Sequence, residues 1–183
     1  LEGLPGFVRE MGAETAREKG QEGWTFPLQA PSYGPFMKYC QDRDLRKQMY
    51  IAYNPRAVGG EFDNREVIKE IAANRLAIAN LLGYETYADY ALENRMAKTR
   101  ETVDNFLQEL VVPSLPYALA EVKEIEDYAH SKGFKGQLQS WDFSFWSEKY
   151  KDAKYSVGEE VLKPYFQLEN CIDAVFGLAT TLY

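Results

Sequence analysis

Aromatic side chains crowd the last third of the chain, residues 141–183, more densely than most solvated surfaces carry them. An aromatic ring buries on the order of 150–250 Å² when it packs, so this segment is expected to anchor a hydrophobic core by itself. Its aromatic residues are Trp141, Phe143, Phe145, Trp146, Tyr150, Tyr155, Tyr165, Phe166, Phe176 and Tyr183.

Elsewhere apolar residues recur at helical spacing, and no run of segments reads as a strand ladder. Thr99 is expected to cap the longest helix, which Pro113 and Pro116 should kink or break, and Gly83 and Asp142 are expected to cap two others. The expected helices cover residues 4–19, 31–53, 65–82, 87–96, 100–131, 142–154 and 170–183, with a further short helix capped by Ser156.

These patterns predict an all-α fold, a layered array of helices of unequal length. At 183 residues the chain is expected to form a single helical segment, residues 1–183, with residues 1–60 and 61–183 as an alternative division into two subregions. A hydrophobic fraction of 45% is ample for a core. No apolar run approaches the roughly 18–20 residues needed to cross a bilayer, so no membrane partner is expected.

Charge and cysteine content narrow the class of protein. A net charge of −7 opposes nucleic-acid binding, which needs clustered Lys and Arg. Cys40 and Cys171 stand far apart without a disulfide framework, and both are expected to be reduced core thiols. This favours a cytoplasmic location, with the periplasm as the alternative.

The histidine count removes many mechanisms. A His-Glu-x-x-His zinc helix needs two histidines, and the chain has only His130. His130 falls near the end of a predicted helix, where a surface histidine interacting with the helix dipole is expected. The chain also lacks a Gly-x-Ser-x-Gly elbow, a phosphate-binding loop and a dinucleotide fingerprint. No catalytic or metal-binding residue is therefore predicted in it.

Carboxylates are the remaining candidates for chemistry. With Lys123 among them, the acidic residues of the longest helix are expected to form a solvated face. A hydrolase that uses Glu121 and Glu124 as a pair is the alternative. Glu159-Glu160 is expected to be the first turn of a helix. The cluster on the longest helix comprises Glu121, Glu124, Glu126 and Asp127.

Two polar sites have apolar neighbours in the sequence. Asn74 and Arg75 are expected to form an ordinary rim or a buried hydrogen-bonded pair, with a ligand-binding role as the alternative. Trp141 and Asp142 could line a peptide groove, although core packing of the ring and capping by the carboxylate explain both residues. The sequence leaves the substrate-binding residues unknown.

Several strings occur in a fixed order: Phe26-Pro-Leu28, residues 42–46, Asn74-Arg75 with residues 79–83, residues 96–99, Trp141-Asp142, residues 162–166, Val175-Phe176 and Leu182-Tyr183. Together they resemble the thimet oligopeptidase and neurolysin family of zinc metallopeptidases over nearly the whole chain. The resemblance is expected to be nearest to the bacterial peptidyl-dipeptidase (dipeptidyl carboxypeptidase) branch, with oligopeptidase A next.

This resemblance implies a helical, zincin-type enzyme with a narrow channel that admits short peptides. In the family, a downstream His-Glu-x-x-His helix and a further glutamate bind zinc, and the motif Glu acts as general base. The chain is therefore expected to be an internal piece of a longer zinc peptidase, forming channel wall and support. It is expected to bind no catalytic zinc and to be inactive alone, and the whole enzyme is expected to release C-terminal dipeptides, with internal cleavage as the alternative.

The expected partners are an oligopeptide substrate and the remainder of the same polypeptide. The alternative function is a non-catalytic helical module that binds a peptide or a protein. Apolar residues near the C-terminus, Ile172, Val175, Phe176 and Leu182, are expected to drive self-association of this chain.

Overall fold

The computed structural model describes residues 1–155 and 163–182, and all regular structure within these ranges is helical. The all-α prediction is thereby confirmed. The helix predicted at Ser156 and the first turn at Glu159-Glu160 lie outside these ranges. The elements are α1 (Gly6–Glu18), α2 (Ala30–Tyr39), α3 (Arg43–Tyr53), α4 (Arg65–Leu81), α5 (Tyr87–Leu92), α6 (Arg100–Ser131), α7 (Ser140–Tyr155), the 3-10 helix η1 (Lys163–Tyr165) and α9 (Leu168–Leu182).

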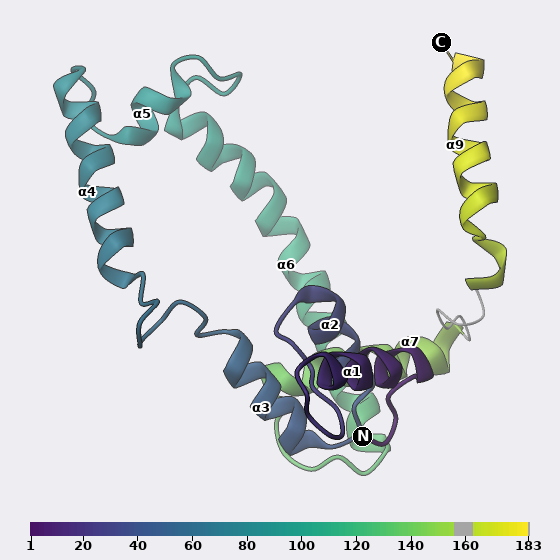
Figure 1. Ribbon diagram of the computed structural model, residues 1–183. Helices are drawn as coiled ribbons and strands as arrows, with labels where there is room; N and C mark the ends of the chain where they lie inside the picture. The colour runs from purple at the N-terminus through teal and green to yellow at the C-terminus, as the bar shows by residue number, and fades with distance from the viewer. Residues whose placement is uncertain (156–162, 183) are drawn as a thin grey trace.

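Helices α1, α2, α3 and α7 and the C-terminal end of α6 pack into one compact body, here called the basal unit (Figure 1). Helix α7 is its common element, because it contacts α2, α3 and α6. The buried core of the unit lies between α1, α2 and α3, with Trp141 of α7 packed against it. The core residues are Leu4, Val8, Phe36, Met37, Cys40 and Met49.

Helix α4, helix α5 and the N-terminal part of α6 extend away from the basal unit (Figure 1). Helix α4 packs on α5 and α5 packs on α6, and among the described elements neither α4 nor α5 touches a basal helix other than α6. Helix α9 stands apart and contacts none of the other helices that the structure describes.

The aromatic segment divides between core and surface. Phe145 is buried, and Trp141, Trp146 and Tyr150 are half-buried on α7. The rings after residue 163 that the structure describes, Tyr165, Phe166 and Phe176, are all exposed. The prediction that this segment anchors a core is therefore right for α7 and wrong for α9, since no described helix covers α9.

The helix predicted over residues 31–53 is two helices. The chain breaks after Tyr39, where Cys40 adopts an extended conformation. Asp42 then caps α3, its Oδ1 accepting hydrogen bonds from the N–H groups of Asp44 and Leu45. A local N-cap satisfies backbone donors that a continuous helix would bond otherwise, so the apolar periodicity across the break was misleading.

Helix α6 begins and ends where the sequence predicts. The Thr99 hydroxyl accepts a hydrogen bond from the Thr102 N–H at 3.2 Å, and the helix ends at Ser131. It continues through Pro113 and Pro116, so of the predicted kink or break, the break does not occur. The Glu109 and Val112 carbonyls lose their helical donors to the prolines, but both residues are exposed, so water can reach these groups.

Helix α7 begins at Ser140, two residues before the predicted cap. Asp142 therefore lies in the first turn, and its Oδ2 accepts a hydrogen bond from the Gln139 N–H at 3.1 Å. Its carboxylate does satisfy a helix-start donor, as predicted, but by reaching back from inside the helix. The same carboxylate meets two arginines of α3.

Candidate functional site

A buried ionic cluster joins α3 to α7. Asp142 is fully buried, and its carboxylate accepts hydrogen bonds from Arg43 Nη2 at 2.8 Å and from Arg46 Nη2 at 3.0 Å. Arg46 Nε donates a hydrogen bond to the Trp141 carbonyl oxygen, and Arg46 Nη1 donates to the carbonyl oxygens of Cys40 and Gln41. Because every group in this cluster already has partners inside the basal unit, its role is to hold the two helices together.

The protonation state of Asp142 fits that role. Burial raises the pKa of its carboxyl group, but hydrogen bonds from Arg43, from the Gln139 N–H and from Arg46 outweigh burial, so the pKa lies below its ordinary value. An ionised, fully bonded carboxylate is a poor general base. Trp141 beside it packs edge-on against Tyr50, so capping and core packing account for both residues without a peptide groove.

The α6 carboxylates face solvent and α7. Glu124 accepts hydrogen bonds from the Tyr150 hydroxyl at 2.6 Å and from Lys154 Nζ at 3.2 Å, which lower the pKa of its carboxyl group. Asp127 pairs with Lys123, and Glu121 is exposed. The structure therefore supports the solvated face rather than a Glu121–Glu124 catalytic pair.

His130 is exposed in the last turn of α6, as predicted. Its Nε2 lies 2.8 Å from the Gly136 carbonyl oxygen, and its ring stacks on Phe134. This contact ties the loop after α6 to the end of the helix.

The cysteines are both free. Cys40 is buried as predicted, and burial raises the pKa of its thiol, so it is not an activated nucleophile. Cys171 lies on α9 and is partly exposed. The prediction that it is a core thiol is therefore wrong, because no described helix packs against α9.

Asn74 and Arg75 lie exposed on α4, which rules out a buried pair and supports the rim interpretation. The Arg75 guanidinium carbon lies 5.5 Å from the centre of the Tyr87 ring, a cation–π contact between α4 and α5.

Tyr87 lines a hollow that the sequence pattern does not predict. We call it the α5 hollow; it has a volume of about 350 Å³ and is lined by Tyr87, Tyr90, Ala91, Asn94 and Arg95. The spacing of two tyrosines three residues apart was visible in the sequence. Helix α5 ends at Leu92, and the turn that follows brings Asn94 and Arg95 next to the two tyrosines. The sequence predicted a helix that continues to Met96, so this turn was not expected.

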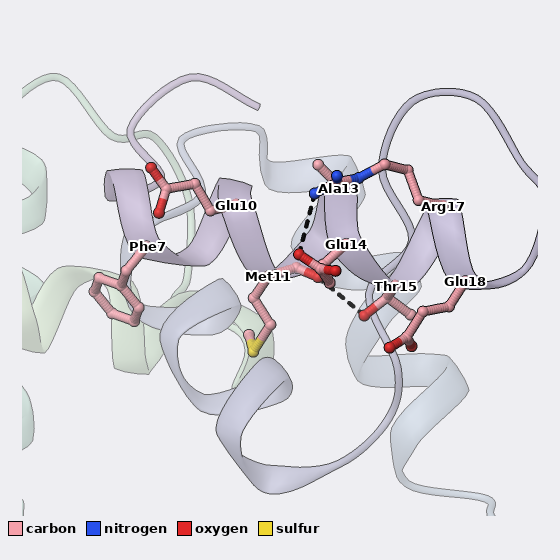
Figure 2. A pocket seen from close by; sticks show the side chains of 8 residues that line it. All are labelled: Phe7, Glu10, Met11, Ala13, Glu14, Thr15, Arg17 and Glu18. Carbon is pink, nitrogen blue, oxygen red and sulfur yellow. Dashed lines mark hydrogen bonds and ion pairs between the residues drawn. The ribbon is translucent and has the colours of Figure 1, made fainter.

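A second hollow, of about 630 Å³, lies along α1 (Figure 2). Its lining residues all belong to that one helix, including Glu10, Glu14 and Glu18 at four-residue spacing. Glu14 pairs with Arg17 at 3.0 Å. Because no second element contributes a side chain, this hollow is an open surface groove without converging groups.

The described residues do not fit a zinc ion. Nowhere in the part of the chain that the structure describes do three His, Cys, Asp or Glu side chains gather closely enough to hold a metal. No helix in the same part is long and apolar enough to cross a membrane.

Comparison with known proteins gives a consistent result. The model of peptidase family M3 matches residues 36–183. Probable cytosolic oligopeptidase A of Arabidopsis thaliana is 38% identical over 192 residues, covering 100% of this chain and 27% of that protein. Oligopeptidase A of Haemophilus influenzae is 36% identical, covering 100% and 28%, and dipeptidyl carboxypeptidase of Salmonella typhimurium is 32% identical, covering 100% and 27%.

The chain thus spans little more than a quarter of the length of these relatives. The identities of 38% and 36% belong to oligopeptidases A and the 32% to a dipeptidyl carboxypeptidase. This order is the reverse of the one expected from the short strings.

Proposed function

The chain belongs to peptidase family M3, and from this premise we propose that the whole protein is a zinc-dependent oligopeptidase in which this chain forms channel wall and support. The observation that carries the proposal is the family match over residues 36–183 together with full coverage of the chain by peptidase relatives. Release of C-terminal dipeptides is the finer proposal, supported by the similarity to dipeptidyl carboxypeptidase.

The exposed apolar surface of α6 favours a structural role, in which the helix packs against the rest of the protein. Exposed apolar residues cover most of the circumference of its middle, whereas Pro113 and Pro116 share the remaining side with Asn105 and Glu109. A helix that is apolar nearly all round is normally buried. We infer that the remainder of the polypeptide packs against this face, whose residues are Phe106, Leu107, Leu110, Val111, Val112, Leu115, Leu119 and Val122.

We propose that the whole protein uses zinc, and this part of the proposal rests only on membership of peptidase family M3. In the whole protein a zinc ion would polarise the scissile carbonyl and activate water. The described residues do not fit such a site, so we propose that its ligands come from outside this chain and that the chain alone is inactive. We also propose a cytoplasmic location, with the periplasm as the alternative; the Arabidopsis relative is named as cytosolic.

Peptide hydrolysis by the intact protein and by this chain tests the proposal. The intact protein should cleave an internally quenched peptide, lose activity with 1,10-phenanthroline and regain it with added zinc, and this chain should show none. Product masses from a peptide with a free C-terminus and from its amide separate dipeptide release from internal cleavage. Chelator-insensitive hydrolysis, or peptide binding without hydrolysis by the intact protein, would overturn the proposal, the latter in favour of a binding module.

A further inference from the structure

Helix α6 is attached to the basal unit at one end only. Ile125 and Ala129 are buried, whereas every residue from 104 to 124 is exposed. The exposed part of α6 contacts α5, which contacts α4, and these three pieces are here called the arm (Figure 1). Among the described residues, the loop of residues 54–64 is the other link between the arm and the basal unit. The direction of the arm therefore depends on how the end of α6 is held on α7.

Three side chains bridge α6 and α7 at the point where α6 leaves the basal unit. Glu124 Oε2 accepts hydrogen bonds from the Tyr150 hydroxyl at 2.6 Å and from Lys154 Nζ at 3.2 Å. Lys154 Nζ also donates a hydrogen bond to the Tyr150 hydroxyl oxygen at 2.9 Å. We call these three residues the α6–α7 clasp. Hydrogen bonds to an ionised group are shorter and stronger than those between neutral groups, so the clasp can hold the two helices at a fixed separation.

The clasp crosses a space that other side chains do not fill. A hollow of about 310 Å³ lies between α6 and α7, and the three clasp residues are among its lining. Closer to the C-terminal end of α6 the helices are packed: the Tyr128 ring lies against Tyr150 and Trp146, with ring centres 5.4 and 6.4 Å away. In the described part of the chain, the clasp is therefore the last polar contact between α6 and α7 before the arm begins.

We propose that the α6–α7 clasp sets the direction of the arm and that Tyr150 is its positioning residue. Without the clasp, α6 is held only by the packed residues from Ile125 onward and can tilt about them, because the hollow leaves it room. A tilt of about 10° would move Asp104, which lies roughly 30 Å from Glu124 along α6, by about 5 Å. The consequence for activity rests on the proposed function: if the arm is channel wall, the clasp sets how closely this wall approaches a bound peptide.

Double electron–electron resonance between two nitroxide labels on this chain measures the direction of the arm. Arg9→Cys in α1 and Asp104→Cys in α6 supply exposed labelling sites, and Cys171→Ser removes the partly exposed native thiol. Dilution with excess unlabelled chain restricts the signal to distances within one molecule. Tyr150→Phe keeps the ring and removes both hydroxyl contacts, so it should shift or broaden the label distance by about 5 Å. Tyr155→Phe is the matched control, because the Tyr155 hydroxyl makes no hydrogen bond among the described residues.

Glu124→Ala removes the same contact from the side of α6. It should change the label distance as Tyr150→Phe does, and the double variant should change it no further, because both substitutions remove one interaction. An unchanged distance in Tyr150→Phe, an equal change in Tyr155→Phe, or additive changes in the double variant would each overturn the clasp.

Peptide hydrolysis by the intact protein tests the consequence for the channel. Tyr150→Phe should raise KM by about three-fold or more and leave kcat unchanged, as expected when peptide binding alone is weakened, and Tyr155→Phe should change neither. A general loss of folded protein would lower kcat instead. An unchanged KM despite a changed label distance would refute the role in the channel. Absence of hydrolysis by the unmodified intact protein would refute only the proposed function, because the distance measurement involves no turnover.

Discussion

Asp142 of α7 and Arg46 of α3 form an ion pair at 3.0 Å in which the aspartate side chain is fully buried and the arginine side chain is 2% exposed. Removing one partner of such a pair leaves the other charge buried without compensation. The pair therefore matters more for what its loss exposes than for its own net attraction.

We expect Asp142→Asn to lower the free energy of unfolding by about 3–5 kcal/mol, because Arg46 stays buried without a counter-charge. Urea titration followed by circular dichroism measures the loss. Asp127→Asn is the control: Asp127 pairs with Lys123 on the surface of α6, so the change should cost less than about 1 kcal/mol. Similar losses in both variants would show that the buried cluster does not hold α3 to α7.

Acid should weaken the same cluster. The pKa of Asp142 is lower in the folded chain than the value of about 3.9 of an unfolded aspartate. Its stabilising contribution is therefore complete above about pH 4 and is lost as the pH falls through the folded pKa. Thermal melting points measured from pH 6 to pH 2 should fall more steeply for the unmodified chain than for Asp142→Asn. Parallel curves would assign acid sensitivity to other groups.

Local signals predicted much of this fold. The Thr99 cap, the end of α6 at Ser131 and the cap at Gly83, which has a positive φ, depend only on nearby residues, and the sequence predicts each of them correctly. The pairing of Asp142 with Arg46 joins residues far apart in the sequence, and no periodicity signals it. Asp42 was missed as a cap because apolar residues at helical spacing lie on both sides of the polar residues 41–44.

The candidate site was harder to predict than the helices. The α5 hollow depends on where α5 ends, and the predicted helix ran past Leu92 to Met96. The sequence singled out Arg75 but offered no reason to connect it with Tyr87. The apolar faces of α9 and of the middle of α6 are not covered by any described helix. The sequence pattern does not show which part of the protein covers them.

Gly12 allows α1 to approach the Phe26 ring closely. A Cβ at this position would lie 2.7 and 2.8 Å from two of the ring carbons, closer than packed atoms can come. We expect Gly12→Ala to destabilise the chain by about 1–3 kcal/mol through overpacking. Gly6→Ala at the start of α1, where a Cβ would meet nothing within 4 Å, should instead stabilise it by up to about 1 kcal/mol. Thermal unfolding measures both, and changes of the same sign would contradict the close approach.

The apolar face of α9 should make this chain self-associate. Ile172, Val175 and Leu182 lie on one side of the helix and are 45–66% exposed. We expect sedimentation velocity to show an average mass that rises with concentration, since a large exposed apolar face favours association. Ile172→Lys should weaken association by about ten-fold or more, because burying an isoleucine contributes roughly 1.5–3 kcal/mol. Thr181→Lys, on the opposite side of α9, should leave association unchanged, and a monomer at every concentration would refute the prediction.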